Sequence, residues 1–153
     1  MKKIFLFGFL ALLLIPLTAC GNDSKNTAAE TKEINDIKIK VIVGNQILTA
    51  TLKDNATTRA LVAKFPLTIP MKDLYAREMC YHFPDALPAN EAGRSGYEIG
   101  DISYWTPRHS LVIFYKQNGE VISNLQKIGA FDSSVKLFEQ TGDTDVTFDL
   151  LNR

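Results

Sequence analysis

Alternation of apolar and polar side chains runs through most of the chain after residue 36, and this period predicts strands rather than long helices. In residues 37–43 apolar positions alternate mostly with lysines, and Gly44-Asn45 then predicts a tight turn into a return strand at 47–52. Further segments rich in β-branched and aromatic residues lie between turn formers, at 67–71, 77–83, 101–105, 111–115, 121–122, 127–131 and 146–150. The pattern predicts a mainly β domain of about eight strands.

Two segments have helical spacing and are short. Residues 56–65 follow Asn55, a side chain that caps helices, and Pro66 ends the segment. Residues 132–140 begin with similar capping residues, and 84–98 contains enough turn formers to predict a long surface loop. Many short strands need a sandwich or a closed barrel to protect their edges. The two helices favour a closed eight-stranded barrel with covered ends.

The start of the chain has a different character. Three residues, Met1 to Lys3, form a basic start, and an uncharged run follows at 4–17. As a helix this run would span about 21 Å, whereas a bilayer core is about 30 Å thick. It therefore predicts a signal peptide rather than a membrane span, and we assign it to residues 1–19.

The residues at the expected cleavage site resemble a lipobox. The order Leu17-Thr18-Ala19-Cys20 places small residues before a cysteine, so we expect cleavage before Cys20 and acylation of that residue, for example by palmitate. Two acyl chains suffice for stable anchoring to membrane lipid. The alternative is an ordinary secretory signal with a chance cysteine.

We therefore expect an exported protein, lipid-anchored to the bacterial cell membrane or the outer membrane. Gly21 follows the cysteine in place of a retention aspartate, which favours the outer membrane in a host that has one. Residues 20–35 are small and polar and predict a lipidated cysteine followed by a flexible tether. Residues 36–153 are long enough for one domain with one core, which we expect to be monomeric.

Charge and cysteine content exclude several classes of function. Loss of Lys2 and Lys3 with the signal peptide lowers the 17 basic side chains to 15, against 17 acidic ones, a formal charge of −2. This balance argues against a nucleic-acid partner. Cys80 is then the only cysteine besides the lipidated one, and His82 and His109 are the only histidines. We therefore expect no intradomain disulfide, no metal and no cofactor; two histidines with carboxylates are the weaker alternative.

Several short motifs resemble the bacterial cyclophilin-like domain family. They are Thr49-Ala50-Thr51-Leu52-Lys53-Asp54-Asn55, the stretch 65–74, Gly100-Asp101-Ile102-Ser103-Tyr104-Trp105, Leu111-Val112-Ile113-Phe114-Tyr115 and Lys127-Ile128-Gly129. Together they span nearly all of 36–153. The resemblance implies a closed eight-stranded β-barrel with two helices, in agreement with the pattern of strands. Members of this family are often small bacterial proteins, and some are lipoproteins.

The resemblance implies less about activity. True cyclophilins are prolyl isomerases whose catalytic strand carries Phe-His-Arg, and the counterpart here is the stretch 79–84. Aligned by its following proline, the arginine position falls on Tyr81, which is neutral and has one hydroxyl where arginine has five donors. Arg77 or Arg108 could substitute from elsewhere in the chain.

The strand at 77–83 places Glu78, Cys80 and His82 on one face. The family pattern often has a glutamate at the place of Glu78. Cys80 and His82 invite a nucleophile–base interpretation. However, residues two apart on a strand are about 7 Å apart and their side chains run parallel. We therefore assign no catalytic residue and expect a small buried cysteine, with Glu78 and His82 hydrogen-bonded at the barrel rim.

An aromatic and cationic cluster lies between two predicted strands. Tyr104 and Trp105 could supply one wall of a groove in which Arg108 holds a carboxylate or a peptide carbonyl. The alternative is a hairpin whose aromatic rings are half core and whose arginine is solvated. The residues that we expect to line a ligand site are Glu78, Tyr81, Tyr104, Trp105, Arg108 and Phe114.

The leading hypothesis is a membrane-anchored lipoprotein whose cyclophilin-like domain binds a peptide or a small ligand without catalysis. The first alternative is a divergent peptidyl-prolyl isomerase that acts on exported proteins. The second is a module that docks to another envelope protein. An isomerase should turn over varied X-Pro peptides, and a binding module should be stabilised by one class of compound. A docking module should show neither effect.

Overall fold

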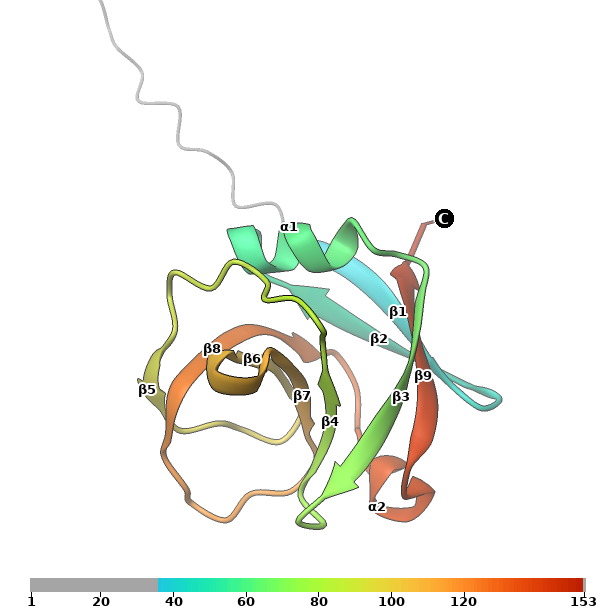
Figure 1. Ribbon diagram of the computed structural model, residues 1–153. Helices are drawn as coiled ribbons and strands as arrows, with labels where there is room; N and C mark the ends of the chain where they lie inside the picture. Colours follow the sequence, from blue (N-terminus) through green and yellow to red (C-terminus); the bar gives the residue numbers. More distant parts are fainter. Residues whose placement is uncertain (1–35, 153) are drawn as a thin grey trace, which may run out of the picture. The chain divides into compact units, whose positions relative to one another are not determined.

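The computed structural model describes residues 36–152, which form a β-barrel (Figure 1). Eight antiparallel strands follow the order β2-β1-β9-β3-β4-β7-β6-β8, and pairing of β2 with β8 closes the ring. The strands are β1 (Ile37–Val43), β2 (Gln46–Leu52), β3 (Leu67–Leu74), β4 (Glu78–His82), β5 (Gly93–Ser95), β6 (Asp101–Trp105), β7 (Ser110–Phe114), β8 (Ile122–Phe131) and β9 (Thr144–Leu150). The predicted fold, a mainly β closed barrel with two helices, is confirmed, and β5 is an additional strand on β8 outside the ring.

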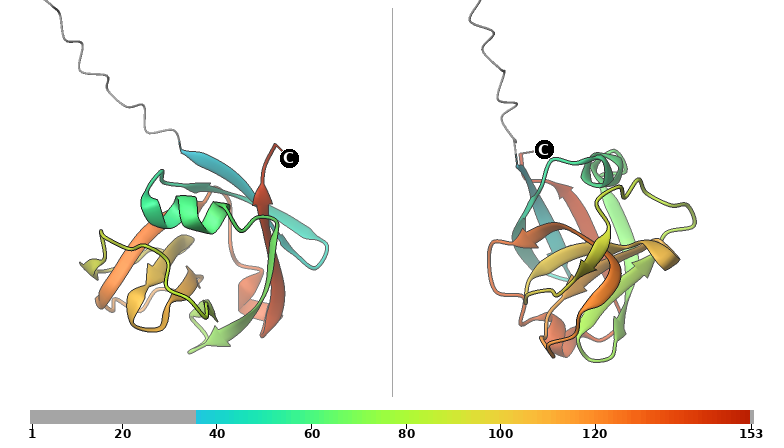
Figure 2. Two further views of the ribbon diagram at one scale, coloured as in Figure 1. Left: turned by 45° about the horizontal axis from the view of Figure 1, so that its top comes forward. Right: turned by 90° about the vertical axis from the view of Figure 1, so that its left-hand side faces the viewer.

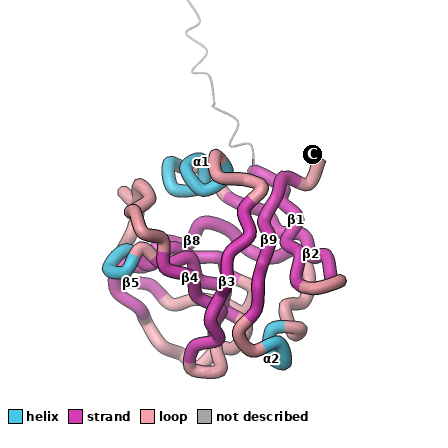
Figure 3. The backbone as a smooth tube through the Cα atoms, turned by 45° about the vertical axis from the view of Figure 1, so that its right-hand side comes forward, coloured by secondary structure: helices cyan, strands magenta, loops and turns pink. Residues whose placement is uncertain are grey.

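The helices lie at opposite ends of the barrel (Figures 1 and 3). Helix α1 (Ala56–Val62) is capped as predicted, because the Asn55 Oδ1 atom accepts a hydrogen bond of 2.9 Å from the Thr58 backbone N–H. Helix α2 (Phe138–Thr141) is shorter than the predicted 132–140. The reason is that Asp132 accepts hydrogen bonds from Lys38 and Thr51 instead of capping a helix.

Two connections also differ from the prediction. The segments predicted at 121–122 and 127–131 are joined in one strand, β8, which begins at Ile122 and continues through Asn124 at a φ of 63°. Asparagine tolerates this left-handed conformation better than most residues, so the chain does not need to break there. The predicted loop at 84–98 contains β5, which adds to the edge of β8 (Figure 2).

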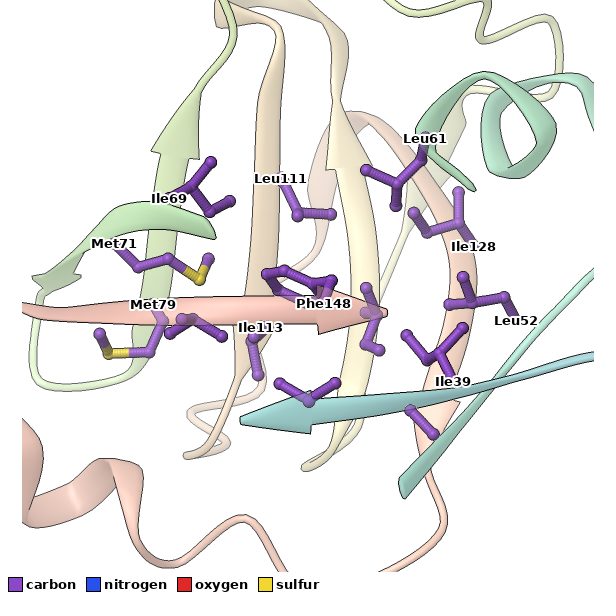
Figure 4. Close-up of a cluster of buried hydrophobic side chains, with 14 of the residues drawn as sticks. Ile39, Leu52, Leu61, Ile69, Met71, Met79, Leu111, Ile113, Ile128 and Phe148 are labelled. Carbon is purple, nitrogen blue, oxygen red and sulfur yellow. The ribbon is translucent and has the colours of Figure 1, made fainter. Parts of the chain in front are cut away.

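The main core fills the barrel and takes side chains from all eight strands of the ring and from both helices. Figure 4 shows part of it, including Ile39, Leu52, Leu61, Ile69, Met71, Met79, Leu111, Ile113, Ile128 and Phe148, each at most 3% exposed. The Phe65 and Phe148 rings stack with centroids 6.3 Å apart. Since this core is contained within residues 36–152, the barrel carries its own source of stability.

Gly129 explains how β8 closes onto β2. A Cβ atom at this position would lie 2.5 Å from the Thr51 carbonyl oxygen and 2.6 Å from the Leu52 Cδ2 atom. Such distances are shorter than van der Waals contact, and the first atom belongs to the backbone. The seam of the barrel therefore requires a residue without a side chain.

A second apolar layer lies on the outer face of the barrel, over the strands β4, β7, β6 and β8. It contains Cys80, Tyr97, Val112, Phe114 and Leu125, with partly buried Leu74, Trp105 and Ile122 beside them. On β7, Leu111 and Ile113 enter the main core while Val112 and Phe114 enter this outer layer, and all five strand residues are buried. The pleat therefore gives β7 two buried faces, and the outer one carries the candidate site.

Candidate functional site

A pocket of about 480 Å³ lies over the outer face of β4 and β7. In the antiparallel register Glu78 is opposite Phe114, Cys80 is opposite Val112, and His82 is opposite Ser110. These three cross-strand pairs all line the pocket. The other lining residues are Leu74, Tyr75, Arg77, Trp105, Arg108, Asn118, Glu120, Ile122 and Leu125. The volume is in the range of ordinary small-molecule sites.

One end of the pocket is built around the Arg77 guanidinium. Its Nε and Nη2 atoms donate to Glu78 Oε2 at 3.1 and 2.7 Å, and its Nη1 atom donates to Glu120. The Arg77 and Glu78 side chains are only 11% and 10% exposed. Burial raises the pKa of Glu78, although the hydrogen bonds and charge of Arg77 act in the opposite direction.

Aromatic rings enclose the same guanidinium. The Arg77 Cζ atom is 5.5 Å from the ring centroids of Tyr75 and Tyr97 and 5.9 Å from that of Phe114. Tyr97 and Phe114 are themselves stacked, with centroids 3.8 Å apart. Cation–π contacts of this kind stabilise a partly desolvated arginine. Arg77 is thereby held in one place, and so are the two carboxylates that it binds.

The other end of the pocket contains His82, Ser110 and Arg108. The His82 Nδ1 and Ser110 Oγ atoms are 2.7 Å apart, and Ser110 Oγ donates to the Arg108 carbonyl oxygen at 3.2 Å. Partial burial, followed by the charge of Arg108, lowers the pKa of His82, so its imidazole is neutral at pH 7. Arg108 is exposed, and within residues 36–152 no carboxylate lies within 4 Å of its guanidinium.

Cys80 lies between the two ends and close to His82. Its Sγ atom is 3.9 Å from His82 Nδ1. Burial raises the pKa of the Cys80 thiol to about 11, so the thiol is protonated at neutral pH. The thiolate, not the thiol, is the nucleophile, and the arrangement therefore does not supply an activated cysteine.

Trp105 forms a wall whose orientation is fixed. Its indole Nε1–H donates to the Ser123 carbonyl oxygen at 2.9 Å, which ties the end of β6 to the start of β8. Tyr75, another lining residue, is 81% exposed and has a φ of 59°, and Ala76 follows with a φ of 47°. Non-glycine residues rarely adopt this conformation, and a strained turn at a site edge often serves to place a side chain.

The structure brings together most of the predicted site residues. Glu78, Trp105, Arg108 and Phe114 line the pocket. Tyr81 and Tyr104 do not line the pocket, because each lies on the face of its strand that is turned toward the main core. Tyr81 packs beside the main core with its ring 5.1 Å from that of Phe83, and Tyr104 is 1% exposed with its hydroxyl accepting from the Leu87 N–H.

The prediction missed a group of lining residues that turns, loops and the first half of β8 bring to the site: Tyr75, Asn118, Glu120, Ile122 and Leu125. One sequence signal could have pointed to them. Residues 111–115 are apolar without interruption, which is typical of a strand buried on both faces. Such a strand requires a second layer outside the barrel, although the sequence does not say which loop supplies it.

The described residues show neither a metal cluster nor a membrane span. No group of three or more His, Cys, Asp or Glu side chains within 36–152 could hold a metal ion. No helix in this part of the chain is long and apolar enough to cross a membrane. The predicted signal peptide, Cys20 and the tether lie outside the described residues.

Comparison with known proteins agrees with this architecture. The sequence pattern of the cyclophilin-like family matches residues 41–149. The chain belongs to the cyclophilin-like family. The solution structure of a hypothetical protein from Archaeoglobus fulgidus is similar to this cyclophilin-like protein, with a TM-score of 0.63 at 16% identity over 78% of this chain and 98% of that one. This similarity supports the fold, and no curated protein matches the chain.

Proposed function

We propose that this cyclophilin-like protein is an exported lipoprotein, anchored through acylated Cys20, whose barrel binds a peptide segment or a small ligand without covalent chemistry. The observation that carries the binding proposal is the pocket on β4 and β7. It combines an apolar floor with a fixed aromatic wall and with polar groups at both ends. Sites of this composition use the apolar surface for affinity and the few polar groups for orientation. The anchoring proposal rests on the sequence at 17–20.

The chemistry of the pocket favours binding over nucleophilic catalysis. The Cys80 thiol is protonated at neutral pH because burial raises its pKa to about 11. The carboxylate of Glu78 is engaged by Arg77 at 2.7 Å. A group that is tied in this way serves recognition, because it presents a fixed hydrogen-bonding pattern to an occupant.

Trp105 provides a direct test, because it is the only tryptophan of the chain and it lines the pocket. We expect at least one class in a panel of amines, carboxylic acids, nucleosides, sugars, free amino acids and blocked X-Pro peptides to change its fluorescence saturably. The protein would be residues 21–153, which contain the whole barrel. The same class should raise the unfolding temperature, because a ligand that binds only the folded state stabilises it.

Variants distinguish pocket binding from binding elsewhere. Val112→Phe would fill the floor of the pocket without adding a second tryptophan and should abolish the response, whereas the exposed Ile99→Ala, outside the pocket, should leave it unchanged. Circular dichroism would establish that both variants fold. If no panel member altered the fluorescence or the unfolding temperature, the binding function would be rejected.

A second candidate function is prolyl isomerisation, and one observation favours it. The position that the family resemblance gives to the catalytic arginine is Tyr81, which lies on the other face of β4, but Arg77 and Arg108 both line the pocket. Arg108 is the better substitute because it is exposed and has no carboxylate partner among residues 36–152. Turnover of X-Pro peptides that is lost in Arg108→Gln and kept in Arg94→Gln would replace the binding-only proposal.

A further inference from the structure

The two ends of the pocket differ in charge. At one end Glu78 and Glu120 flank a single cation, Arg77, which leaves an excess of negative charge. Arg77 occupies Glu78 Oε2, and no described residue donates a hydrogen bond to Oε1. At the other end Arg108 has no carboxylate partner within residues 36–152. The site is therefore dipolar, with an acceptor end and a cationic end.

The surface between these ends is apolar and has a defined length. Cys80, Val112 and Leu125 form it, and the Trp105 ring lies alongside. Glu78 and His82 are four residues apart on β4, which separates their Cα atoms by about 13 Å. An extended peptide covers about 3.3–3.6 Å per residue, so three or four residues would span this distance.

We infer that the pocket binds a short apolar peptide of three or four residues with free ends, its ammonium group at Glu78 and Glu120 and its carboxylate at Arg108. The inference rests on the proposed binding function and specifies its ligand class. The positive and negative ends of such a peptide match the acceptor end and the cationic end of the pocket. Its apolar side chains match the apolar floor between them. An internal segment of a protein lacks both end charges and would leave the two charged ends of the site unmatched.

The test uses one tetrapeptide of alanine, valine, leucine and alanine in four forms: free, N-acetylated, C-amidated and blocked at both ends. Trp105 fluorescence of residues 21–153 would report the affinity of each form. We expect C-amidation to weaken binding about tenfold, because a hydrogen bond to an arginine contributes about 1.5 kcal/mol or more. Acetylation should weaken it about threefold, because Glu120 is 52% exposed and its ionic contacts are screened.

Variants assign each end of the peptide to one end of the pocket. In Arg108→Gln the free and amidated peptides should bind equally. In Glu120→Gln the difference between the free and acetylated peptides should shrink, because only Glu78 then faces the ammonium group. Arg94→Gln and Glu139→Gln change exposed residues outside the pocket and should preserve both differences. A variant that weakened all four forms by the same factor would indicate a general loss of affinity rather than recognition of an end.

Three results would overturn the inference. If all four forms bound with equal affinity, the ends would not be recognised, while the proposed binding function would stand. If none of the four bound, this ligand class would be wrong, and the panel of other compounds would decide the binding function separately. Tight binding of the doubly blocked form alone would instead indicate an internal segment of a polypeptide as the occupant.

Discussion

The inner and outer faces of one barrel wall carry apolar layers of different kinds. Inside, Met79, Leu111 and Ile113 are fully buried in a core that a ring of strands and two helices enclose. Outside, Val112 and Phe114 lie in a small layer that loops cover only in part, with the charged pair Arg77–Glu78 at its edge. A complete enclosure favours stability, whereas a partial one leaves a pocket in which polar groups remain accessible.

The largest expected difference between the two layers is in the free energy of unfolding that is lost when a leucine is replaced by alanine. Leu111→Ala in the inner core should lower the free energy of unfolding by about 4 kcal/mol, because the closed barrel cannot collapse onto the cavity. Leu125→Ala in the outer layer should cost about 2 kcal/mol, because loops and water can fill the space. Urea denaturation of residues 21–153 measures both, and Ile99→Ala, a side chain 59% exposed, serves as the control. Equal losses would show that the outer layer is packed as completely as the inner one.

The reactivity of Cys80 tests whether the outer layer shields its polar groups from water. Its thiol pKa is raised from 9.0 to about 11, so its thiolate fraction near neutral pH is roughly a hundredfold lower than that of an ordinary cysteine. Alkylation of residues 21–153 by iodoacetamide should therefore be slower by about this factor than alkylation of the same chain in urea. Cys80 is the only cysteine in this stretch, so the unfolded chain is its own control. Equal rates would show that the outer layer does not shield the thiol.

The fold was more predictable than the site, because the fold depends on local patterns. Alternation at 37–43 and the Gly44-Asn45 turn were sufficient to predict the first hairpin, in which Val43 pairs with Gln46. The second helix was predicted too long because Asp132 was expected to cap a helix formed by the residues that follow it. That carboxylate instead binds Lys38 and Thr51, residues about ninety positions away in sequence.

The site required information that a strand pattern does not contain. Glu78, Trp105, Arg108 and Phe114 were grouped from chemistry and neighbourhood, and all four line the pocket. Tyr81 and Tyr104 were grouped with them, but a one-residue step along a strand reverses the face of a side chain. Glu120 could not be predicted, because its place depends on the path of the loop that carries it to Arg77.

The Arg77–Glu78 pair should make the outer layer sensitive to pH. Arg77→Met leaves the Glu78 carboxylate, 10% exposed, without its guanidinium, and we expect a loss of about 2 kcal/mol at pH 7. The pKa of Glu78 is already raised by burial, so its proton binds more tightly in the folded state than in the unfolded state. Stability in the variant should therefore rise as pH falls from 7 toward 5. Arg77→Met combined with Glu78→Gln should remove this dependence, and a pH-independent loss in the single variant would contradict the explanation.

His82 should produce a smaller pH dependence of the opposite sign. Its pKa is lowered in the folded state by partial burial and then by the charge of Arg108, so the unfolded chain binds the proton more readily. As pH falls through 6.5 toward the folded-state pKa, stability should decrease, and above 6.5 the effect should be absent. Thermal unfolding in the Glu78→Gln background at pH 5.5 and 7.5 isolates this contribution, and adding His82→Gln should reduce the difference between the two pH values. His109→Asn removes the other histidine and keeps a residue that tolerates its φ of 51°, so it should retain the difference. If His82→Gln left the difference in unfolding temperature between pH 5.5 and 7.5 unchanged, protonation of His82 would not be the cause. The cationic end of the pocket would then not disfavour a second positive charge.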